Sequence, residues 1–419
     1  MNRARVQSRD HDIVLWGATG FTGRLVAEHL VGQLAATGVR LALGGRDADR
    51  LEAIRRDLTR ISPAASELPL IVADSHDRAS LDAMAAAAGV VCSTVGPYAV
   101  HGHELVAACV DRDTDYCDLT GEVQFIRRMI DRHHDRARAS GTRIVHCCGF
   151  DSIPSDLGTL VLQESAIDRH GAPFDDVTFV LGASRGGFSG GTVASLVNVL
   201  DEAASDRSVR RVLTDPYALN PPGERHGPDG PDQSGPRFDR ELGRWTGPFI
   251  MAAINTRIVR RTNALLDWRY GRDFGYREVT GFGPGLTGRL AATAAAGGIG
   301  ALVGALAWGP TRSLLLKTLL PSPGDGPDRA ARERGFFTID LHGRRASGTG
   351  DAVTGRVRVH GDHDPGYGET SRMLGESALC LALDGAELDS PGGVLTPAAA
   401  MGLRLVDRLR RVGMVFDVS

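Results

Sequence analysis

The chain has 419 residues, which is enough for two or three domains with sizeable cores. Its charges nearly cancel to a formal net charge of −3, which argues against a nucleic-acid-binding surface. Six cysteines without CxxC spacing predict reduced thiols in a cytoplasmic protein, and the polar start of the chain does not resemble a signal peptide. Lys317 is the sole lysine, so Schiff-base chemistry has almost no candidate nucleophile.

Short apolar runs alternate with helical patterns over residues 1–150. The runs expected as strands are residues 12–16, 40–44, 70–73, 90–94, 116–119 and 143–147. Because this alternation is typical of βαβ units, it predicts an α/β fold that begins with a Rossmann-like, doubly wound parallel sheet. We expect residues 1–150 to form an NAD(P)-binding domain.

The pattern changes after residue 150, and we expect residues 151–369 to form an α+β substrate domain. The expected elements are a strand at 177–181, helices at 192–204 and 249–266, a long loop or lid at 215–248, and an antiparallel hairpin of 336–341 with 353–359. An amphipathic helix at 396–412 and a short strand at 414–418 complete the chain.

Residues 290–311 form an apolar stretch without a charged residue. Its length is near the ~20 residues that a membrane-spanning helix needs. However, the stretch consists mostly of alanine and glycine and is only weakly hydrophobic. This composition favours a buried or an interfacial helix over a transmembrane helix.

A glycine-rich loop, Gly17-Ala-Thr-Gly20-Phe-Thr-Gly23, directly follows the first expected strand and opens a helix. Glycines there allow a tight turn, and the free N–H groups of the helix N-terminus attract a pyrophosphate. The GxxGxxG spacing differs from the GxGxxG fingerprint, so the strand–loop–helix context carries the prediction of dinucleotide binding. The expected cofactor contacts are Gly17, Thr19, Gly20, Phe21, Thr22 and Gly23.

Arg46 follows the second expected strand, where NAD enzymes often place an acid that holds the ribose hydroxyls. An arginine pairs well with a 2′-phosphate, so the sequence favours NADP. The adjacent Asp47 keeps NAD open, and Arg46 as a solvated loop charge is the alternative. Asp74 and Ser75, after the third strand, are expected beside the adenine.

The segment Ser93-Thr-Val-Gly-Pro-Tyr98 follows the fourth strand. Ligands of doubly wound sheets bind outside the carboxyl ends of the strands, so Thr94, Gly96 and Pro97 are expected near the nicotinamide. Tyr98 offers a hydroxyl donor for the reaction. A packed tyrosine in an ordinary turn is the competing interpretation.

Acidic residues follow the fifth and sixth strands. Asp118 and Glu122 lie after the fifth, and the string CCGFDSIPSDLG, which contains Asp151 and Asp156, begins at residue 147. Helix capping explains the serines and the proline of this string. Capping is also the alternative for Asp151, which we otherwise expect to orient the nicotinamide or the substrate. No histidine–cysteine group has zinc spacing, so we expect no metal site.

These strings resemble the saccharopine dehydrogenase-like oxidoreductases. The resemblance rests on GATGFTG, GGR, STVGPY, HGHELVAACVDRDTDYCDLTGE and CCGFDSIPSDLG. Three further strings are similar to the trans-acting enoyl reductase branch: MAAINTRIVRRTNALL, DPGYGETSRMLGESALCLA and GGVLTPAAAMGLRLVDRLRRVGMVFDV. The resemblance extends from about residue 14 to the C-terminus.

The resemblance implies an enzyme with a Rossmann domain and a substrate domain, with residues 370–419 packed back on the first domain. It implies NADPH-dependent reduction of a carbon–carbon double bond in a polyketide-derived, long-chain lipid intermediate. Peripheral membrane association and a homo-oligomer are further expectations. Tyr98 is the first candidate for the donor to the enolate oxygen, and Asp118, Glu122 and Asp151 are candidates for acid–base or orienting roles.

Two alternatives stay open. An amino-acid or opine-type dehydrogenase on the same scaffold requires cations beside its substrate, and Arg257, Arg260 and Arg261 are the candidates. The same arginines would equally suit a lipid or carrier phosphate. A non-catalytic, NADP-binding, lipid-associated protein is the second alternative.

Overall fold

The computed structural model describes residues 8–186, 190–318, 326–346 and 352–419. Its first sheet is parallel throughout, with strand order β13-β6-β5-β4-β1-β2-β3. Its strands are β1 (His11–Trp16), β2 (Leu41–Gly45), β3 (Leu70–Val72), β4 (Ala88–Ser93), β5 (Asp115–Asp118), β6 (Arg143–Val145) and β13 (Gly393–Leu395). The strand order reverses between β1 and β4, which is where such sheets bind their ligands. The prediction of a Rossmann-like, doubly wound sheet is confirmed.

Strands β2 and β4 are buried along their whole length, as is typical of parallel strands that helices cover on both faces. The helices of this part are α2 (Phe21–Thr37), α3 (Ala48–Leu58), η1 (Pro63–Glu67), α4 (Arg78–Ala87), α5 (Tyr98–His101), α6 (His103–Asp111) and α7 (Val123–Ser140). Local chemistry sets their ends. Asp47 accepts a hydrogen bond from the Arg50 backbone N–H at 3.0 Å and so caps α3.

The second sheet is mixed, with strand order β14-β12-β11-β7-β10-β9-β8. Its strands are β7 (Asp176–Arg185), β8 (Arg237–Asp239), β9 (Arg244–Pro248), β10 (Gly275–Gly281), β11 (Phe336–Arg345), β12 (Val353–Gly361) and β14 (Val415–Val418). Strands β7 and β10 are parallel, and the other neighbours are antiparallel. The expected β11–β12 hairpin is present.

The prediction of an unstructured loop over residues 215–248 is wrong in its last part. Strands β8 and β9 form an antiparallel hairpin there, and β9 pairs with β10. The many prolines and glycines of this segment did not predict strand β9. Its pairing with β10 nevertheless buries Thr246, Gly247 and Pro248. The partner strand, which lies about thirty residues later in the chain, supplies the order that local propensity does not.

The remaining helices surround the second sheet and join it to the first. They are α8 (Ile153–His170), α9 (Gly190–Ser205), α10 (Arg207–Thr214), α11 (Ala252–Leu265), α12 (Leu286–Ala307), α13 (Gly309–Thr318), α14 (Arg329–Glu333), the π-helix η2 (Pro365–Glu369), α15 (Thr370–Leu383) and α16 (Pro397–Arg411). Helices α8 and α11 pack on the second sheet, and α15 packs on α2, β4 and β5 of the first part.

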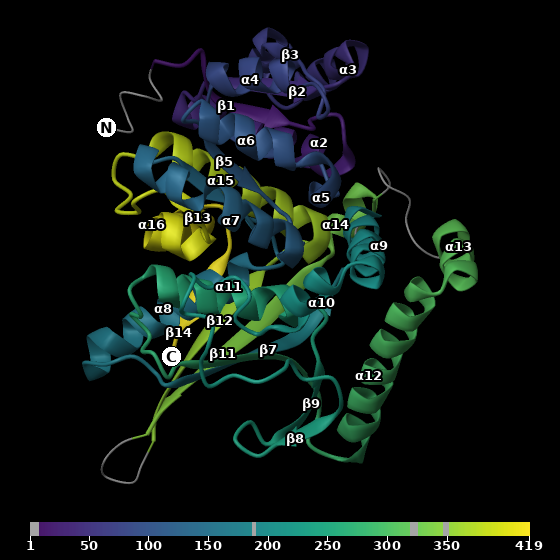
Figure 1. The fold of residues 1–419 in the computed structure, drawn as a ribbon, viewed down its shortest axis with the longest axis vertical. Coiled ribbons are helices and arrows are strands. Elements are labelled where there is room, and N and C mark those ends of the chain that lie inside the picture. The colour runs from purple at the N-terminus through teal and green to yellow at the C-terminus, as the bar shows by residue number, and fades with distance from the viewer. Residues whose placement is uncertain (1–7, 187–189, 319–325, 347–351) are drawn as a thin grey trace.

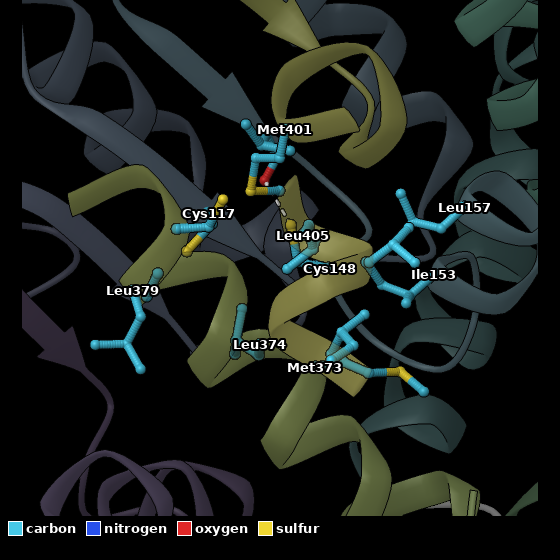
Figure 2. Close-up of a cluster of buried hydrophobic side chains, with 14 of the residues drawn as sticks. Cys117, Cys148, Ile153, Leu157, Met373, Leu374, Leu379, Met401 and Leu405 are labelled. Carbon is cyan, nitrogen blue, oxygen red and sulfur yellow. Dashed lines mark hydrogen bonds between the residues drawn. The ribbon is translucent and has the colours of Figure 1, made fainter. Parts of the chain in front are cut away.

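The C-terminal segment lies between the two sheets (Figure 1). Helix α15 packs against α16, and α16 packs against α8, so one hydrophobic core runs from the first sheet to the second. Figure 2 shows its centre, with side chains from β5, the β6–α8 junction, α8, α15 and α16: Cys117, Cys148, Ile153, Leu157, Met373, Leu374, Leu379, Met401 and Leu405. Strand β13 then extends the first sheet, and β14 extends the second.

Helix α12 lies at the edge of the molecule, where it packs on β9 and α9 (Figure 1). In the described part of the chain, it is the one helix long and apolar enough to cross a membrane, with a mean hydropathy of 1.8 over its most apolar window. Only 11% of that window is buried in the protein. The expectation of a buried helix is therefore wrong, and the interfacial alternative stays a prediction.

Candidate active site

The loop between β1 and α2 has the shape of a phosphate cradle. Gly17 has a φ of +91°, and a Cβ on Gly23 would lie 2.0 Å from the Gly17 carbonyl oxygen, so only glycines allow this close packing. Gly20 is the N-cap and offers no side chain to the helix. Within the described chain, the N–H groups of Phe21 and Thr22 have no protein acceptor. They are therefore free for an anion at the N-terminus of α2.

A cavity of about 550 Å³ lies over the carboxyl ends of the first sheet's strands, beside this cradle. Most of the predicted site residues line it: Gly17, Thr19, Gly20, Phe21, Thr22, Gly23, Arg46, Ser75, Thr94, Gly96, Tyr98, Glu122 and Asp151. Asp74, Pro97 and Asp118 do not. The Asp74 carboxylate instead accepts the His76 backbone N–H at 2.8 Å and closes a turn next to Ser75.

Arg46 is exposed at the end of β2, lines the cavity, and has no hydrogen-bond partner within the described chain. Its neighbour Asp47 is the α3 cap and does not line the cavity. A cation, not a carboxylate, is thus available where the cofactor ribose is expected. This arrangement suits a 2′-phosphate.

Glu122 joins the segments at the end of the cavity where the nicotinamide is expected. Its Oε1 accepts the Tyr98 N–H and the Ser195 hydroxyl, both at 2.8 Å, and its Oε2 accepts the Ala99 N–H at 2.8 Å. The side chain therefore holds the start of α5 and joins it to α9. Burial raises the pKa of Glu122 above its ordinary range.

Tyr98 is 3% exposed, and its hydroxyl donates to the Ser93 carbonyl at 3.1 Å. Burial raises the pKa of this phenol well above its ordinary value. The Tyr98 hydroxyl proton is thus used in a hydrogen bond within the protein, which matches the packed-tyrosine interpretation. As a donor to substrate, Tyr98 would have to give up this bond.

Asp118 is fully buried, and both its oxygens are satisfied. Its Oδ2 accepts the Tyr116 hydroxyl at 3.0 Å and bonds to His146 Nδ1 at 2.7 Å. Its Oδ1 accepts the Thr120 N–H at 3.1 Å. The residue joins β5 to β6 beneath the cavity, where it lacks access to a ligand.

The two aspartates of the β6–α8 junction have different environments. Asp156 accepts the Thr262 hydroxyl and, at 2.8 Å, the Ala398 N–H, so it fastens α8 to α11 and α16. Asp151 has no hydrogen-bond partner within the described chain, and the N-cap of α8 is Ser152. The capping alternative therefore does not describe Asp151. Burial raises the pKa of Asp151 to about 6, from an ordinary 3.8.

A second cavity of about 350 Å³ adjoins the first, and Asp151 lines both. Thr22, Leu119, Met251 and Leu302 are also common to the two. The remaining walls of the second cavity are mostly apolar, and no lysine, arginine or histidine of the described chain lines it. Asp151 therefore stands between a nucleotide-sized cavity and an apolar one.

Comparison with known proteins identifies the family. A Mycobacterium tuberculosis (H37Rv) protein, provisionally named a trans-acting enoyl reductase, is 46% identical over 420 residues, with 98% of each chain covered. A trans-acting enoyl reductase of Mycobacterium bovis (BCG) is 41% identical over 424 residues, with the same coverage. The chain belongs to the trans-acting enoyl reductase family. It is an oxidoreductase of the enoyl reductase type.

A solved structure shares the fold of this enoyl reductase family member. Saccharopine dehydrogenase (L-Glu forming) from Saccharomyces cerevisiae matches with a TM-score of 0.50 and 14% identity, over 97% of this chain and 99% of that one. The search against family models gave no match. The dehydrogenase fold and the family together imply a nicotinamide cofactor, which the glycine cradle fits.

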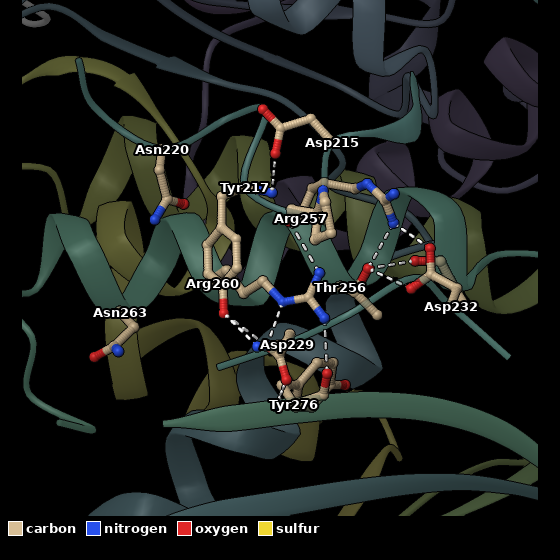
Figure 3. A network of polar contacts seen from close by, with 12 residues as sticks. Asp215, Tyr217, Asn220, Asp229, Asp232, Thr256, Arg257, Arg260, Asn263 and Tyr276 are labelled. Atoms are coloured by element: carbon tan, nitrogen blue, oxygen red, sulfur yellow. Dashed lines mark hydrogen bonds and ion pairs between the residues drawn. The ribbon is translucent and has the colours of Figure 1, made fainter. Parts of the chain in front are cut away.

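The three arginines that an amino-acid dehydrogenase would need do not reach this enoyl reductase's cavities. Arg257 pairs with Asp232, and Arg260 pairs with Asp229 at 2.6 Å and donates to the Tyr276 carbonyl at 2.9 Å (Figure 3). Arg261 donates to the carbonyls of Leu219 and Val394. All three are at most 3% exposed. They fasten the segment before β8 to α11, so the proposal that they meet a substrate is wrong.

Much of the site comes from segments that the sequence did not single out. Helix α9, the start of α11, helix α12 and η2 supply these walls: Thr192, Val193, Ser195, Leu196, Val199, Ile250, Met251, Ala253, Ile254, Leu302, Leu306 and Tyr367. Most are apolar and lie far along the chain from the glycine loop. The one available signal was the charge-free run at 290–311, which contains Leu302 and Leu306.

Proposed function

We propose that this protein is an NADPH-dependent enoyl reductase of a polyketide-derived, long-chain lipid intermediate, and that Asp151 is its proton donor. The observation that carries the proposal is the position of Asp151. Its unpartnered carboxyl group lies between the cofactor cavity and an apolar cavity without cations.

The chain's residues fit the cofactor. The cradle at Gly17 and Gly23 and the N-terminus of α2 would hold the pyrophosphate, and Arg46 would pair with the 2′-phosphate. When bound, the reduced nicotinamide supplies a hydride to the β-carbon of the double bond. Glu122 holds the backbone of Tyr98 and Ala99 in place beside the end of the cavity where the nicotinamide would lie.

The α-carbon of the substrate then needs a proton. A carboxyl group whose pKa is raised to about 6 keeps a usable protonated fraction near neutral pH. Asp151 meets this requirement. Burial raises its pKa, and its side chain lines both cavities. Asp118 and Glu122 are committed to hydrogen bonds within the protein, so we assign them, and Tyr98, positioning roles.

The test is NADPH consumption with enoyl thioesters, followed by mass spectrometry of the saturated product. We expect turnover with a long-chain enoyl thioester, and a lower KM for NADPH than for NADH. Tight NADPH binding without turnover on any enoyl thioester would overturn the proposal and favour a non-catalytic binding protein. Turnover with an amino-acid substrate would instead favour the opine-type alternative.

We also propose that α12 contacts a lipid surface. In α12, Leu286 is 70% exposed and Leu290 is 61% exposed, and the C-cap residue Trp308 is 63% exposed. Apolar helices with exposed leucine and tryptophan bind well at a membrane interface. A cytoplasmic enzyme that docks peripherally on a membrane through α12 agrees with this surface.

A further inference from the structure

We propose that the second cavity is an alkyl-chain chamber, that α12 is its outer wall, and that Gly298 keeps its mouth open. This inference rests on the proposed function and specifies its substrate as an enoyl thioester with a long saturated tail. The reacting double bond would lie beside Asp151, and the tail would extend through the second cavity toward α12.

The chemistry of the chamber suits a hydrocarbon. Phe150, Leu181 and Phe249 form its walls, and Asp151 is the one charged side chain of the described chain that lines it. Two of the walls are braced from behind. Phe150 packs edge-on against Phe337 with ring centroids 4.8 Å apart, and Phe249 stacks on Phe179 at 5.4 Å. Because these apolar walls are held in place by packing, the chamber is already formed before an alkyl chain binds.

Helix α12 closes the open side. Gly298, Ile299 and Leu302 line the chamber, while Leu302 and Leu306 line the cofactor cavity. Residues at this spacing share one face of a helix, so a single face of α12 borders both cavities. Most of the helix is otherwise exposed, so the chamber mouth lies beside an apolar surface.

We place the mouth at Gly298 because this residue both lines the chamber and is exposed. A Cβ placed on it meets no atom within 4 Å. A larger side chain at this position would therefore extend into open space at the entrance without disturbing the fold. Gly300, two residues later, is also exposed and has no atom within 4 Å of its Cβ position, but it lines neither cavity.

These two glycines give a matched pair of variants, Gly298→Leu and Gly300→Leu. Both changes replace a helical glycine by a good helix former, so both variants should fold at least as well as the parent. The probes are crotonyl and trans-hexadecenoyl thioesters of N-acetylcysteamine. In the parent enzyme, KM should fall by about fourfold for each methylene that the chamber buries.

We expect Gly298→Leu to raise the ratio of the KM for the hexadecenoyl thioester to the KM for the crotonyl thioester by about fourfold per displaced methylene. Gly300→Leu should behave as the parent with both. Equal KM values for the two variants with the long substrate would overturn the inference, as would a parent KM independent of chain length.

Binding of cis-parinaric acid, followed by its fluorescence, tests the chamber without turnover. The parent and Gly300→Leu should bind this fatty acid, and Gly298→Leu should bind it at least tenfold more weakly, the effect of two displaced methylenes at about fourfold each. If no thioester is reduced but this pattern holds, the chamber stands and the proposed function fails. If thioesters are reduced but Gly298→Leu binds the probe like the parent, the chamber assignment fails alone.

Discussion

Replacing Asp151 by asparagine should slow catalysis and stabilise the fold at the same time. The amide keeps the shape of the carboxyl group but cannot donate the proton that the α-carbon needs. Loss of a general acid typically costs about 10²–10⁴-fold, and we expect kcat to fall by that factor. The parent kcat should decrease as pH rises through about 6, where Asp151 loses its proton.

The stability effect follows from the same pKa. Burial raises the pKa of Asp151 from 3.8 to about 6, so the folded protein holds this proton more tightly than the unfolded chain. The parent therefore loses stability as pH rises through this window, and the loss is complete above it. Two pKa units correspond to about 3 kcal/mol, which is the upper limit of the gain that asparagine should give well above pH 6. Below pH 3.8 the two proteins should be equally stable.

The assay pairs steady-state NADPH oxidation with urea unfolding across the pH range, and Asp156→Asn is the matched control. Asp156 lies in the same junction, but both its oxygens accept hydrogen bonds, from Thr262 and Ala398. Asparagine offers one acceptor oxygen there, which costs about 1–3 kcal/mol, but burial also raises the pKa of Asp156 to about 7, so removal of its charge opposes this loss. The control is therefore read in turnover: Asp156 lines neither cavity, so Asp156→Asn should keep the parent kcat. Full turnover of Asp151→Asn, or an equal fall of kcat in the two variants, would refute the assignment of Asp151.

Three further outcomes are expected. Arg46→Ala should weaken NADPH binding by about 1–3 kcal/mol in calorimetric titration and leave NADH binding unchanged; equal parent affinities for the two cofactors would contradict the 2′-phosphate assignment. Gly23→Ala should abolish cofactor binding and lower Tm because its Cβ would lie 2.0 Å from the Gly17 carbonyl oxygen, whereas Gly32→Ala in the same helix, with no atom within 4 Å of its Cβ position, should bind normally and gain about 0.5–1 kcal/mol of stability. A membrane-bound fraction should be released by a carbonate wash at high pH, since α12 contacts the surface without crossing it; retention in the pellet would show that residues 286–307 span the bilayer.

The sequence determined the parts of this protein whose causes are local. Alternating apolar runs and helical patterns set the first parallel sheet, because strand and helix periodicities are read within one element. The cradle at Gly17 and Gly23 depends on seven adjacent residues and on the strand before them. The charge-free run that became α12 was likewise visible, because composition over one helix length decides how apolar its surface is.

Only the tertiary structure decided which polar residue does what. Asp118 ends β5 and Asp151 follows β6. Tyr116 and His146 form hydrogen bonds with the Asp118 carboxylate, whereas no group of the described chain pairs with Asp151. Arg257 and Arg260 are equally plausible as substrate contacts until the segment before β8 folds over them and supplies carboxylates.

The walls of the second cavity were also decided at this level. They combine Phe150 after β6, Leu181 of β7, Phe249 before α11 and Ile299 of α12, which are ordinary apolar residues in their own segments. Periodicity tells which face of an element is buried, but it does not tell what that face meets. The partner of each side chain comes from a distant part of the chain. Which polar groups find hydrogen-bond partners, and what shape the cavities take, is therefore settled only once the two sheets and α12 are in place.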